Sequence, residues 1–156
     1  MDASAPILVL RDPRESWSRC SLRPLRGRPD IEFVTWRENL ELEVGPRVLL
    51  DPSAPELGPE ERGLGLFVID CSWRRLPRIG RAVVDEPPRR SLPPLVTAYP
   101  RRSSIFADPS TGLATVEALF AASALLGRPD PTLLDGYRFA DEFLAANPEL
   151  AGPPKR

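Results

Sequence analysis

The residues best placed to do chemistry are Asp70, Cys71, Ser72 and Trp73, which directly follow an apolar run at residues 66–69. In α/β sheets ligands bind beyond the carboxyl ends of the strands, so a site would form at this point of the chain. A carboxylate there can accept hydrogen bonds from a ribose diol or from a reacting N–H group. A tryptophan supplies a flat apolar wall for an adenine or a thioether chain. The alternative is structural: Asp70 or Ser72 caps a following short helix, and Trp73 belongs to the core.

The composition excludes several kinds of active site. The 156 residues include no histidine, which rules out Ser-His-Asp and Cys-His nucleophile pairs, HExxH zinc sites and haem held by histidine. Cys20 and Cys71 are the only cysteines and form no CxxC motif, so we expect no metal site; a lone disulfide stays open. Residues 1–6 contain no basic leader, and the apolar run near residues 118–126 is too short to span a bilayer. We therefore expect a cytoplasmic protein with reduced thiols and no membrane contact.

Charge is segregated along the chain, although the formal net charge is only −1. Residues 38–62 hold seven acidic residues and two arginines, a balance of −5, whereas residues 71–105 hold eight arginines and two acidic residues, a balance of +6. Arginine makes bidentate contacts with phosphate, so the second segment predicts a phosphate-binding surface. The alternative is a solvated surface on which these arginines pair with the acidic stretch.

These residues must be positioned by short strands and late helices. Apolar runs bounded by breakers predict strands at residues 7–10, 31–36, 48–50, 66–69 and 95–98. A helical turn is expected at 59–62, a helix at 113–126 ended by Gly127, and a second helix from Asp130–Pro131 to Asn147. Twenty prolines exclude a long helical bundle. Strands interleaved with helices predict a single compact α/β domain with a mostly parallel sheet.

Three motifs, in this order, carry a resemblance to a known family: VIDCSW at residues 68–73, RSLPPLVTAYP at 90–100 and LATVEALFAASALLG at 113–127. They resemble the ribosome-biogenesis aminocarboxypropyltransferases, which modify a pseudouridine in small-subunit rRNA. That family shows a DCSW-type motif, an R-x-LPYLVAANPVNYG stretch and a helix that opens with LS-x-VEA. The last helix fits the family's F…N…L pattern with Phe143, Asn147 and Leu150. Residues 46–57, and Asp12 with Cys20–Ser21, extend the resemblance over nearly the whole chain.

The resemblance implies a SPOUT-like fold, a parallel α/β sheet whose C-terminal part forms a trefoil knot. Residues 1–64 would be an N-terminal α/β part, 65–150 the cofactor-binding part and 151–156 a tail. It implies S-adenosylmethionine as the cofactor and transfer of its 3-amino-3-carboxypropyl group to a uridine or pseudouridine nitrogen. The implied partner is small-subunit rRNA or the pre-ribosome. We expect the protein to be a monomer. Because the sulfonium already activates the carbon, positioning supplies most of the acceleration and no histidine or metal is required.

The resemblance also assigns roles to residues. Asp70, the catalytic candidate, would form hydrogen bonds with the ribose or the base. A second possible role for it is that of general base, which would take the proton from the N–H group of the uracil-type base. Free backbone N–H groups at the start of the 113–126 helix could hold the cofactor's carboxylate or adenine. Glu117 matches the family's glutamate; the alternative is an early-helix acid favoured by the helix dipole. The implied cofactor-binding residues are Asp70, Trp73, Leu92, Leu95, Ala98, Leu113, Thr115 and Ala118. The expected RNA-binding residues are Arg74, Arg75, Arg89, Arg90, Arg101 and Arg102.

The sequence departs from the family pattern after the second motif. The NPVNYG stretch is replaced by residues 99–104, and the loop before Leu113 is longer. Ala114 stands where the family has serine, so a capping box at that helix is expected to be lost. The arginine-rich loop also resembles the DTW-domain enzymes, which place the same group on tRNA uridine. The alternatives are therefore a tRNA aminocarboxypropyltransferase, a SPOUT-type RNA methyltransferase, or a non-catalytic RNA or ribosome-assembly module.

Overall fold

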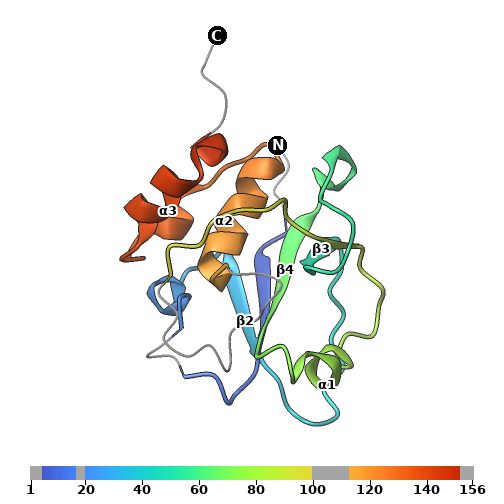
Figure 1. Cartoon of the computed structure of the whole chain (residues 1–156). Helices are drawn as coiled ribbons and strands as arrows, with labels where there is room; N and C mark the ends of the chain where they lie inside the picture. Colours follow the sequence, from blue (N-terminus) through green and yellow to red (C-terminus); the bar gives the residue numbers. More distant parts are fainter. Residues whose placement is uncertain (1–4, 17–19, 100–112, 152–156) are drawn as a thin grey trace.

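Five parallel strands form one sheet in the order β2-β1-β4-β3-β5 (Figure 1). The computed structural model describes residues 5–16, 20–99 and 113–151. The strands are β1 (Ile7–Arg11), β2 (Ile31–Thr35), β3 (Arg47–Leu50), β4 (Gly65–Asp70) and β5 (Arg89–Arg90). The predicted α/β class with a mostly parallel sheet is confirmed. Four of the five predicted strands form, and the short strand β5 was not predicted.

Helical segments cover both faces of the sheet, which is why the central strands are continuously apolar. On one face Val9 and Val68 pack in a cluster with the helix α2 residues Leu119 and Phe120. On the other face Leu8, Leu10 and Phe67 pack with Ile79 of helix α1. Figure 1 shows α2 and α3 above one face and α1 near the lower end of the sheet. The helices are α1 (Leu76–Gly80), α2 (Thr115–Leu125) and α3 (Ala140–Ala146), with 3-10 segments η2 (Arg23–Leu25), η3 (Pro59–Glu61), η5 (Pro131–Leu134) and η6 (Pro148–Ala151).

The strand predicted at residues 95–98 is wrong. The N–H group of Val96 donates to Asn147 Oδ1 at 2.8 Å, and Asn147 Nδ2 donates to the Val96 carbonyl at 2.7 Å. The N–H group of Ala98 donates to Glu117 Oε2 at 3.0 Å. Side chains at the end of α3 and the start of α2 therefore take the place of a neighbouring strand. The segment is apolar like a strand, but its backbone groups are bonded by side chains.

The single helix predicted from residue 131 to 147 is also wrong, because the chain breaks at Gly136. Segment η5 ends at Leu134, two residues before Gly136, and α3 begins at Ala140, four residues after it. Gly136 has a φ of +80°, and a Cβ on it would lie 2.7 Å from Pro24 Cβ. The close approach of the η2 segment requires glycine here, and the left-handed backbone stops the helix. The apolar side chains of this segment are nevertheless buried at Leu133, Tyr137 and Phe143.

These two constraints at Gly136 can be separated by comparison with Gly127, which ends α2 at a φ of +84°. A Cβ on Gly127 would meet no atom closer than 3.9 Å, so Gly127→Ala carries the backbone cost alone. We expect Gly127→Ala to lower the free energy of unfolding by about 1 kcal/mol. We expect Gly136→Ala to lower it by about 2–4 kcal/mol, because overpacking adds to the strain. Urea denaturation followed by circular dichroism measures both, and equal losses would contradict the contact with Pro24.

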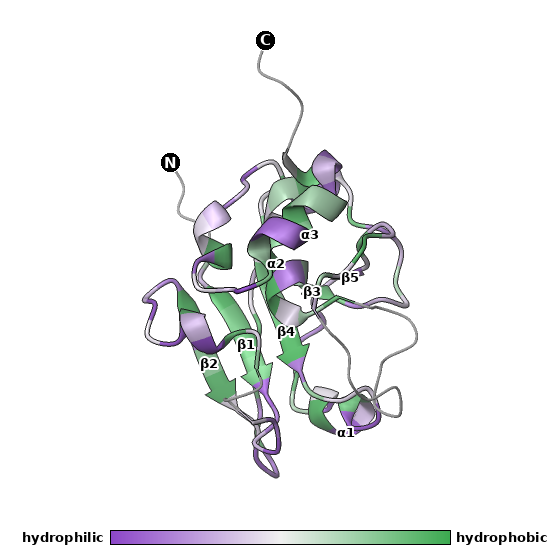
Figure 2. Ribbon diagram, turned by 60° about the vertical axis from the view of Figure 1, so that its left-hand side comes forward, coloured by the Kyte–Doolittle hydropathy of each residue, from purple (hydrophilic) through white to green (hydrophobic). Residues whose placement is uncertain are grey.

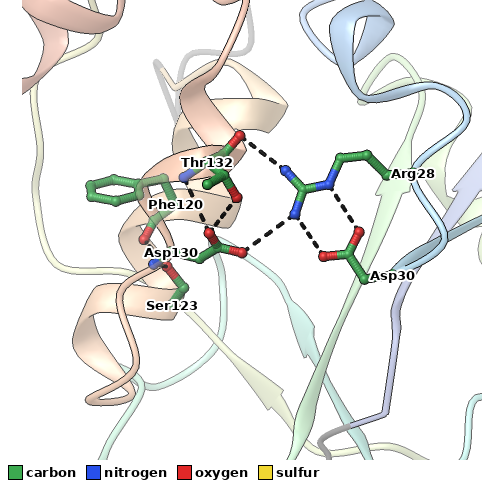
Figure 3. Close-up of polar contacts among 6 residues, drawn as sticks. All are labelled: Arg28, Asp30, Phe120, Ser123, Asp130 and Thr132. Atoms are coloured by element: carbon green, nitrogen blue, oxygen red, sulfur yellow. Dashed lines mark hydrogen bonds and ion pairs between the residues drawn. The ribbon is translucent and has the colours of Figure 1, made fainter.

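Arg28 ties the edge of the sheet to the C-terminal helices (Figure 3). Its guanidinium donates to the two carboxylate oxygens of Asp30 at 2.9 and 2.6 Å and to the Thr132 carbonyl at 2.9 Å. It also pairs with Asp130, whose Oδ1 accepts the Thr132 N–H at 3.1 Å and so provides the predicted N-cap. Arg28 lowers the pKa of Asp30, so this pair contributes stability at neutral pH and loses it as the pH falls through that lowered pKa.

None of the helices in the described part of the chain is long and apolar enough to cross a membrane.

Candidate functional site

A cleft of about 1080 Å³ lies beyond the carboxyl ends of β1, β3 and β4. The chain leaves β1 toward β2 on one side and leaves β4 toward β5 on the other, so a crevice opens between the ends of the adjacent strands β1 and β4. Figure 2 shows the arrowheads of β1, β2 and β4 at this end of the sheet, with α1 beside the end of β4. The site predicted at the end of residues 66–69 thus coincides with the place where the topology forms a cleft.

Most of the residues implied as cofactor-binding line this cleft. They are Trp73, Leu92, Leu95, Leu113, Thr115 and Ala118. The other two are not in the lining: Asp70 accepts a hydrogen bond from Thr115, which is, whereas the N–H group of Ala98 donates to Glu117, which is buried outside the lining. Residues separated by more than forty positions in the sequence are therefore gathered around one space.

The structural alternative for the Asp70–Trp73 motif is wrong in both parts. Trp73 is 46% exposed and lies at the cleft, so it is not a core residue. The N-cap residue of α1 is Arg75, and no side chain caps that helix. An exposed tryptophan at a cleft is a feature that packing does not explain.

The Asp70 carboxylate joins three segments at the end of the sheet. Its Oδ1 accepts a hydrogen bond from Thr115 Oγ1 at 3.2 Å, and its Oδ2 accepts one from Cys20 Sγ at 3.4 Å. Oδ2 also lies 3.6 Å from the guanidinium of buried Arg11, its register partner on β1. Because alternate residues of β4 face α2, this side chain points to the first turn of that helix. It is 13% exposed, so the carboxylate holds the base of the cleft rather than lying open within it.

Two further carboxylates stand at the same edge. Asp12 is fully buried and accepts hydrogen bonds from the Arg14 N–H at 3.0 Å and from Arg75 Nε at 2.6 Å. Glu15 lines the cleft, and its pKa is raised by burial and by the negative charges of Asp70 and Asp12. Within the described ranges no three His, Cys, Asp or Glu side chains form a group that could hold a metal ion. The sequence analysis did not single out Glu15, because nothing in its local sequence places it at the cleft.

The two cysteines are free thiols at this edge of the sheet. Burial raises the pKa of each to about 12, with further contributions from Asp70 at Cys20 and from Asp12 at Cys71. Both thiols are therefore neutral at physiological pH, and neither is an activated nucleophile.

Alkylation rates test this environment. At pH 8 we expect both thiols of the folded protein to react with iodoacetamide at least about 100-fold more slowly than free cysteine, because only the thiolate attacks. Because both pKa values are raised, the thiolate fraction, and with it the alkylation rate, rises only as the pH approaches 12. Mass spectrometry of quenched samples gives the rates, and the urea-unfolded protein is the control. Fast labelling of the folded protein would show that an activated thiolate is present.

Glu117 is the most connected polar side chain near the cleft, and it is fully buried. Its Oε1 accepts hydrogen bonds from Thr97 Oγ1 at 2.6 Å and from the Ala114 N–H at 2.9 Å. Its Oε2 accepts them from the Ala98 N–H at 3.0 Å and from the Tyr137 hydroxyl at 2.7 Å. Burial, and then this last hydrogen bond, raise the pKa of Tyr137, so the phenol stays protonated. Glu117 thus fixes the segment after Leu95 against the first turn of α2.

The expected loss of the capping box at Ala114 is only half correct. The Ala114 N–H group is still bonded by Glu117, and the N–H group of Val116 donates to Ser21 Oγ at 3.1 Å. Ser21 therefore replaces the missing cap from a distant segment, which the local sequence cannot show.

Several arginines of residues 71–105 pair with carboxylates, as the alternative interpretation of that segment expects. Arg89 pairs with Asp51 at 3.4 Å, Arg90 pairs with Glu61 at 3.1 Å, and Arg78 pairs with Glu38. All three carboxylates belong to the acidic stretch 38–62. Arg101 and Arg102 lie outside the described residues. Binding of RNA by Arg74, Arg75, Arg89, Arg90 and these two arginines stays a prediction.

Comparisons with known proteins agree with this arrangement. The sequence model of the family described as "Ribosome biogenesis protein, C-terminal" matches residues 48–152. Among solved structures, the chain is similar to that of the SAM-dependent rRNA:acp-transferase Tsr3 from Vulcanisaeta distributa, with a TM-score of 0.69 and 25% identity. That likeness covers 94% of this chain and 82% of the other. No curated protein sequence matches the chain.

Proposed function

We infer the function from one premise: the chain belongs to the family described as "Ribosome biogenesis protein, C-terminal", whose sequence model covers most of its length. We propose that it is an S-adenosylmethionine-dependent RNA-modifying enzyme. The reaction transfers the 3-amino-3-carboxypropyl group to a base nitrogen of a uridine or pseudouridine in small-subunit rRNA during ribosome biogenesis. The similarity in fold to an enzyme named as a SAM-dependent rRNA:acp-transferase supports this assignment.

The observation that carries the proposal is the cleft at the ends of β1, β3 and β4, lined by six of the eight residues implied as cofactor-binding. Its chemistry fits the cofactor. Trp73 and the leucines at 92, 95 and 113 offer an apolar wall for an adenine and a thioether chain. Carboxylates at its edge, among them Glu15 and Asp51, suit hydroxyl and ammonium groups. At the start of α2 the N–H groups of Ala114 and Val116 already donate to Glu117 and Ser21, so these two groups are not free to hold the cofactor's carboxylate.

When bound, S-adenosylmethionine supplies a sulfonium that activates the carbons attached to it. This chain's residues would choose among those carbons by position. The wall formed by Trp73, Leu92 and Leu95 would orient the cofactor and exclude water. Glu117 keeps that wall in place through Thr97 and Ala98. Asp70 remains the catalytic candidate in this proposal, because its carboxylate accepts a hydrogen bond from Thr115, which lines the cleft.

The proposal also includes the finer expectations from the sequence. The protein would act in the cytoplasm as a monomer, with residues 65–150 as the cofactor-binding part. A SPOUT-type trefoil knot in the C-terminal part remains a prediction, because residues 100–112 lie outside the described chain.

Two measurements test the function. Nucleoside mass spectrometry of rRNA and tRNA from a strain that lacks the protein should show loss of an aminocarboxypropyl nucleoside from rRNA. Titration calorimetry should show S-adenosylmethionine binding that Trp73→Ala weakens, whereas Val84→Ala, another exposed apolar position outside the cleft lining, leaves it unchanged. Loss from tRNA would identify the tRNA enzyme instead, and loss of a methylated nucleoside a methyltransferase. If the nucleoside profile is unchanged and S-adenosylmethionine does not bind, the enzymatic functions are excluded and the non-catalytic RNA or ribosome-assembly module remains.

A further inference from the structure

One group of cations lies beside the cleft and includes no residue assigned to the cofactor. Arg74, Arg75, Arg78 and Arg81 lie within and around α1, and no acidic residue occurs between positions 71 and 84. Arg75 also lines the cleft, as do Trp73 and Leu76. This positive segment therefore continues directly from the cleft onto the surface at the end of β4.

A tryptophan from another strand fixes part of this group. Trp36 follows β2, and the guanidinium groups of Arg75 and Arg78 lie 5.6 and 5.5 Å from the centre of its ring. Arg75 is in addition held by the buried carboxylate of Asp12 at 2.6 Å. Arginines ordered in advance lose less conformational freedom when they bind a ligand, so the arrangement favours binding at this place.

The partners of Arg74, Arg78 and Arg81 separate these three arginines from Arg89 and Arg90. Arg75 is bound to the fully buried Asp12, so its part is to orient the group beside Trp36. Arg89 and Arg90 pair with carboxylates that are largely buried, Asp51 (16% exposed) and Glu61 (4% exposed), so a phosphate would have to displace a strong partner. Arg78 pairs instead with Glu38, whose side chain is 64% exposed, and such exposed pairs are weak. Arg74 and Arg81 are exposed and form no ion pair with any carboxylate of the described residues.

We propose that the α1 arginine surface, defined as Trp36 with Arg74, Arg75, Arg78 and Arg81, binds the phosphate backbone of RNA next to the nucleotide that enters the cleft. This inference rests on the proposed function and adds the place where its RNA substrate docks. RNA is favoured over an acidic protein because planar guanidinium groups match phosphate geometry and occur here with aromatic rings, the combination typical of single-stranded RNA sites. The phosphates that flank a base in the cleft must also lie close to its rim.

The first experiment compares two double variants with equal loss of charge. The probe is a fluorescein-labelled oligouridylate of about twelve nucleotides, and its affinity is measured by anisotropy over a series of salt concentrations. We expect Arg74→Ala/Arg81→Ala to weaken binding about tenfold and to reduce the salt slope by about 1.4, because two phosphate contacts are lost. The control Arg62→Ala/Arg138→Ala removes two exposed arginines outside this surface and should change the affinity less than about twofold. Equal losses in both would overturn the proposal.

In the second experiment, the substitution is expected to strengthen RNA binding rather than weaken it. Glu38→Gln removes the carboxylate that competes for Arg78 and should tighten oligouridylate binding about threefold. Glu32→Gln, an exposed position on β2, makes the same change in net charge and should have no comparable effect. Equal tightening by the two variants would show a general charge effect and would contradict a docking surface at α1.

Trp36 can be tested separately, as a residue that positions the arginines. Trp36→Phe keeps an aromatic ring under the two guanidinium groups and should retain most of the affinity for oligouridylate. Trp36→Leu should reduce that affinity about as much as the removal of one arginine does. Equal affinities of the two variants would overturn this role. An oligoglutamate of matched charge that competes as well as the oligouridylate would point to a protein partner and overturn the RNA assignment.

Failure of this inference can be distinguished from failure of the proposed function. S-adenosylmethionine affinity, measured by calorimetry, should be unchanged in all these variants, because none of the changed residues is assigned to the cofactor. If cofactor binding and the rRNA nucleoside are present but RNA affinity does not depend on α1, only the docking surface is wrong. If RNA binding depends on α1 but no aminocarboxypropyl nucleoside is made, the docking surface stands and the proposed function is wrong.

Discussion

Glu117→Ala is expected to lower the free energy of unfolding by about 3–5 kcal/mol, because it removes a buried carboxylate and leaves its hydrogen-bond donors without an acceptor. Those donors are Thr97, Ala98, Ala114 and Tyr137. Where the protein remains folded, the segment that follows Leu95 should no longer be fixed against α2. We therefore also expect a loss of S-adenosylmethionine affinity of at least about tenfold. Urea denaturation and titration calorimetry measure the two effects.

Two controls separate the network from a general effect of changing an acid on a helix. Glu142→Ala changes an exposed glutamate on α3 and should alter stability by less than about 0.5 kcal/mol. Thr97→Val removes one donor to Glu117 and the acceptor of the Tyr99 N–H group, keeps the shape of the side chain, and should reduce cofactor affinity more than stability. Should Glu117→Ala retain wild-type cofactor affinity while losing stability, the glutamate would serve the fold alone.

Asp70→Ala is expected to lower the free energy of unfolding by about 3 kcal/mol, because it leaves the charge of buried Arg11 without this carboxylate. It also removes the acceptor for Thr115 at the cleft, so cofactor binding and RNA modification should be lost. Thermal or urea unfolding, calorimetry and nucleoside mass spectrometry of a complemented deletion strain give the three readouts.

Asp70→Asn distinguishes the roles of this side chain. The amide keeps the size and one hydrogen-bond acceptor but not the charge, so we expect about half of the stability loss. If charge at residue 70 is needed by the ligand, modification should still be lost in a folded Asp70→Asn protein. Asp135→Ala, at an exposed position, is the matched control and should leave all readouts unchanged. Full modification by Asp70→Asn would remove Asp70 from the catalytic assignment.

The strands could be predicted from sequence because their signal is local. Buried parallel strands must be apolar on both faces, and the runs in β1 and β4 show this directly. The same criterion failed at residues 95–98, where Leu95 lines the cleft and Leu95 and Ala98 pack against the core without forming a strand. Their backbone partners are the side chains of Asn147 and Glu117, and a pairing between a side chain and a distant backbone leaves no periodic trace.

The candidate site could be predicted in outline for a related reason. A polar motif after a buried strand marks the carboxyl end of a sheet, and the Asp70–Trp73 motif led to the cleft. The implied assignment of Leu92, Leu95, Leu113 and Thr115 came from a resemblance between whole motifs rather than from their spacing. The pairing of Arg75, Arg89 and Arg90 with buried carboxylates, and of Arg78 with an exposed one, could not be predicted, because it depends on which acid faces which arginine.

The sequence alone determined the α/β class and the absence of imidazole chemistry, and it pointed to the end of residues 66–69, where the cleft lies, because composition and short-range pattern suffice for each. The tertiary structure decided what each polar side chain does. It showed Asp70 bonded to Thr115 and Arg11, Glu117 as the anchor of the cleft wall, and Ser21 as a substitute helix cap. These contacts join positions far apart in the chain, and only the packing of the sheet and helices fixes which of them meet.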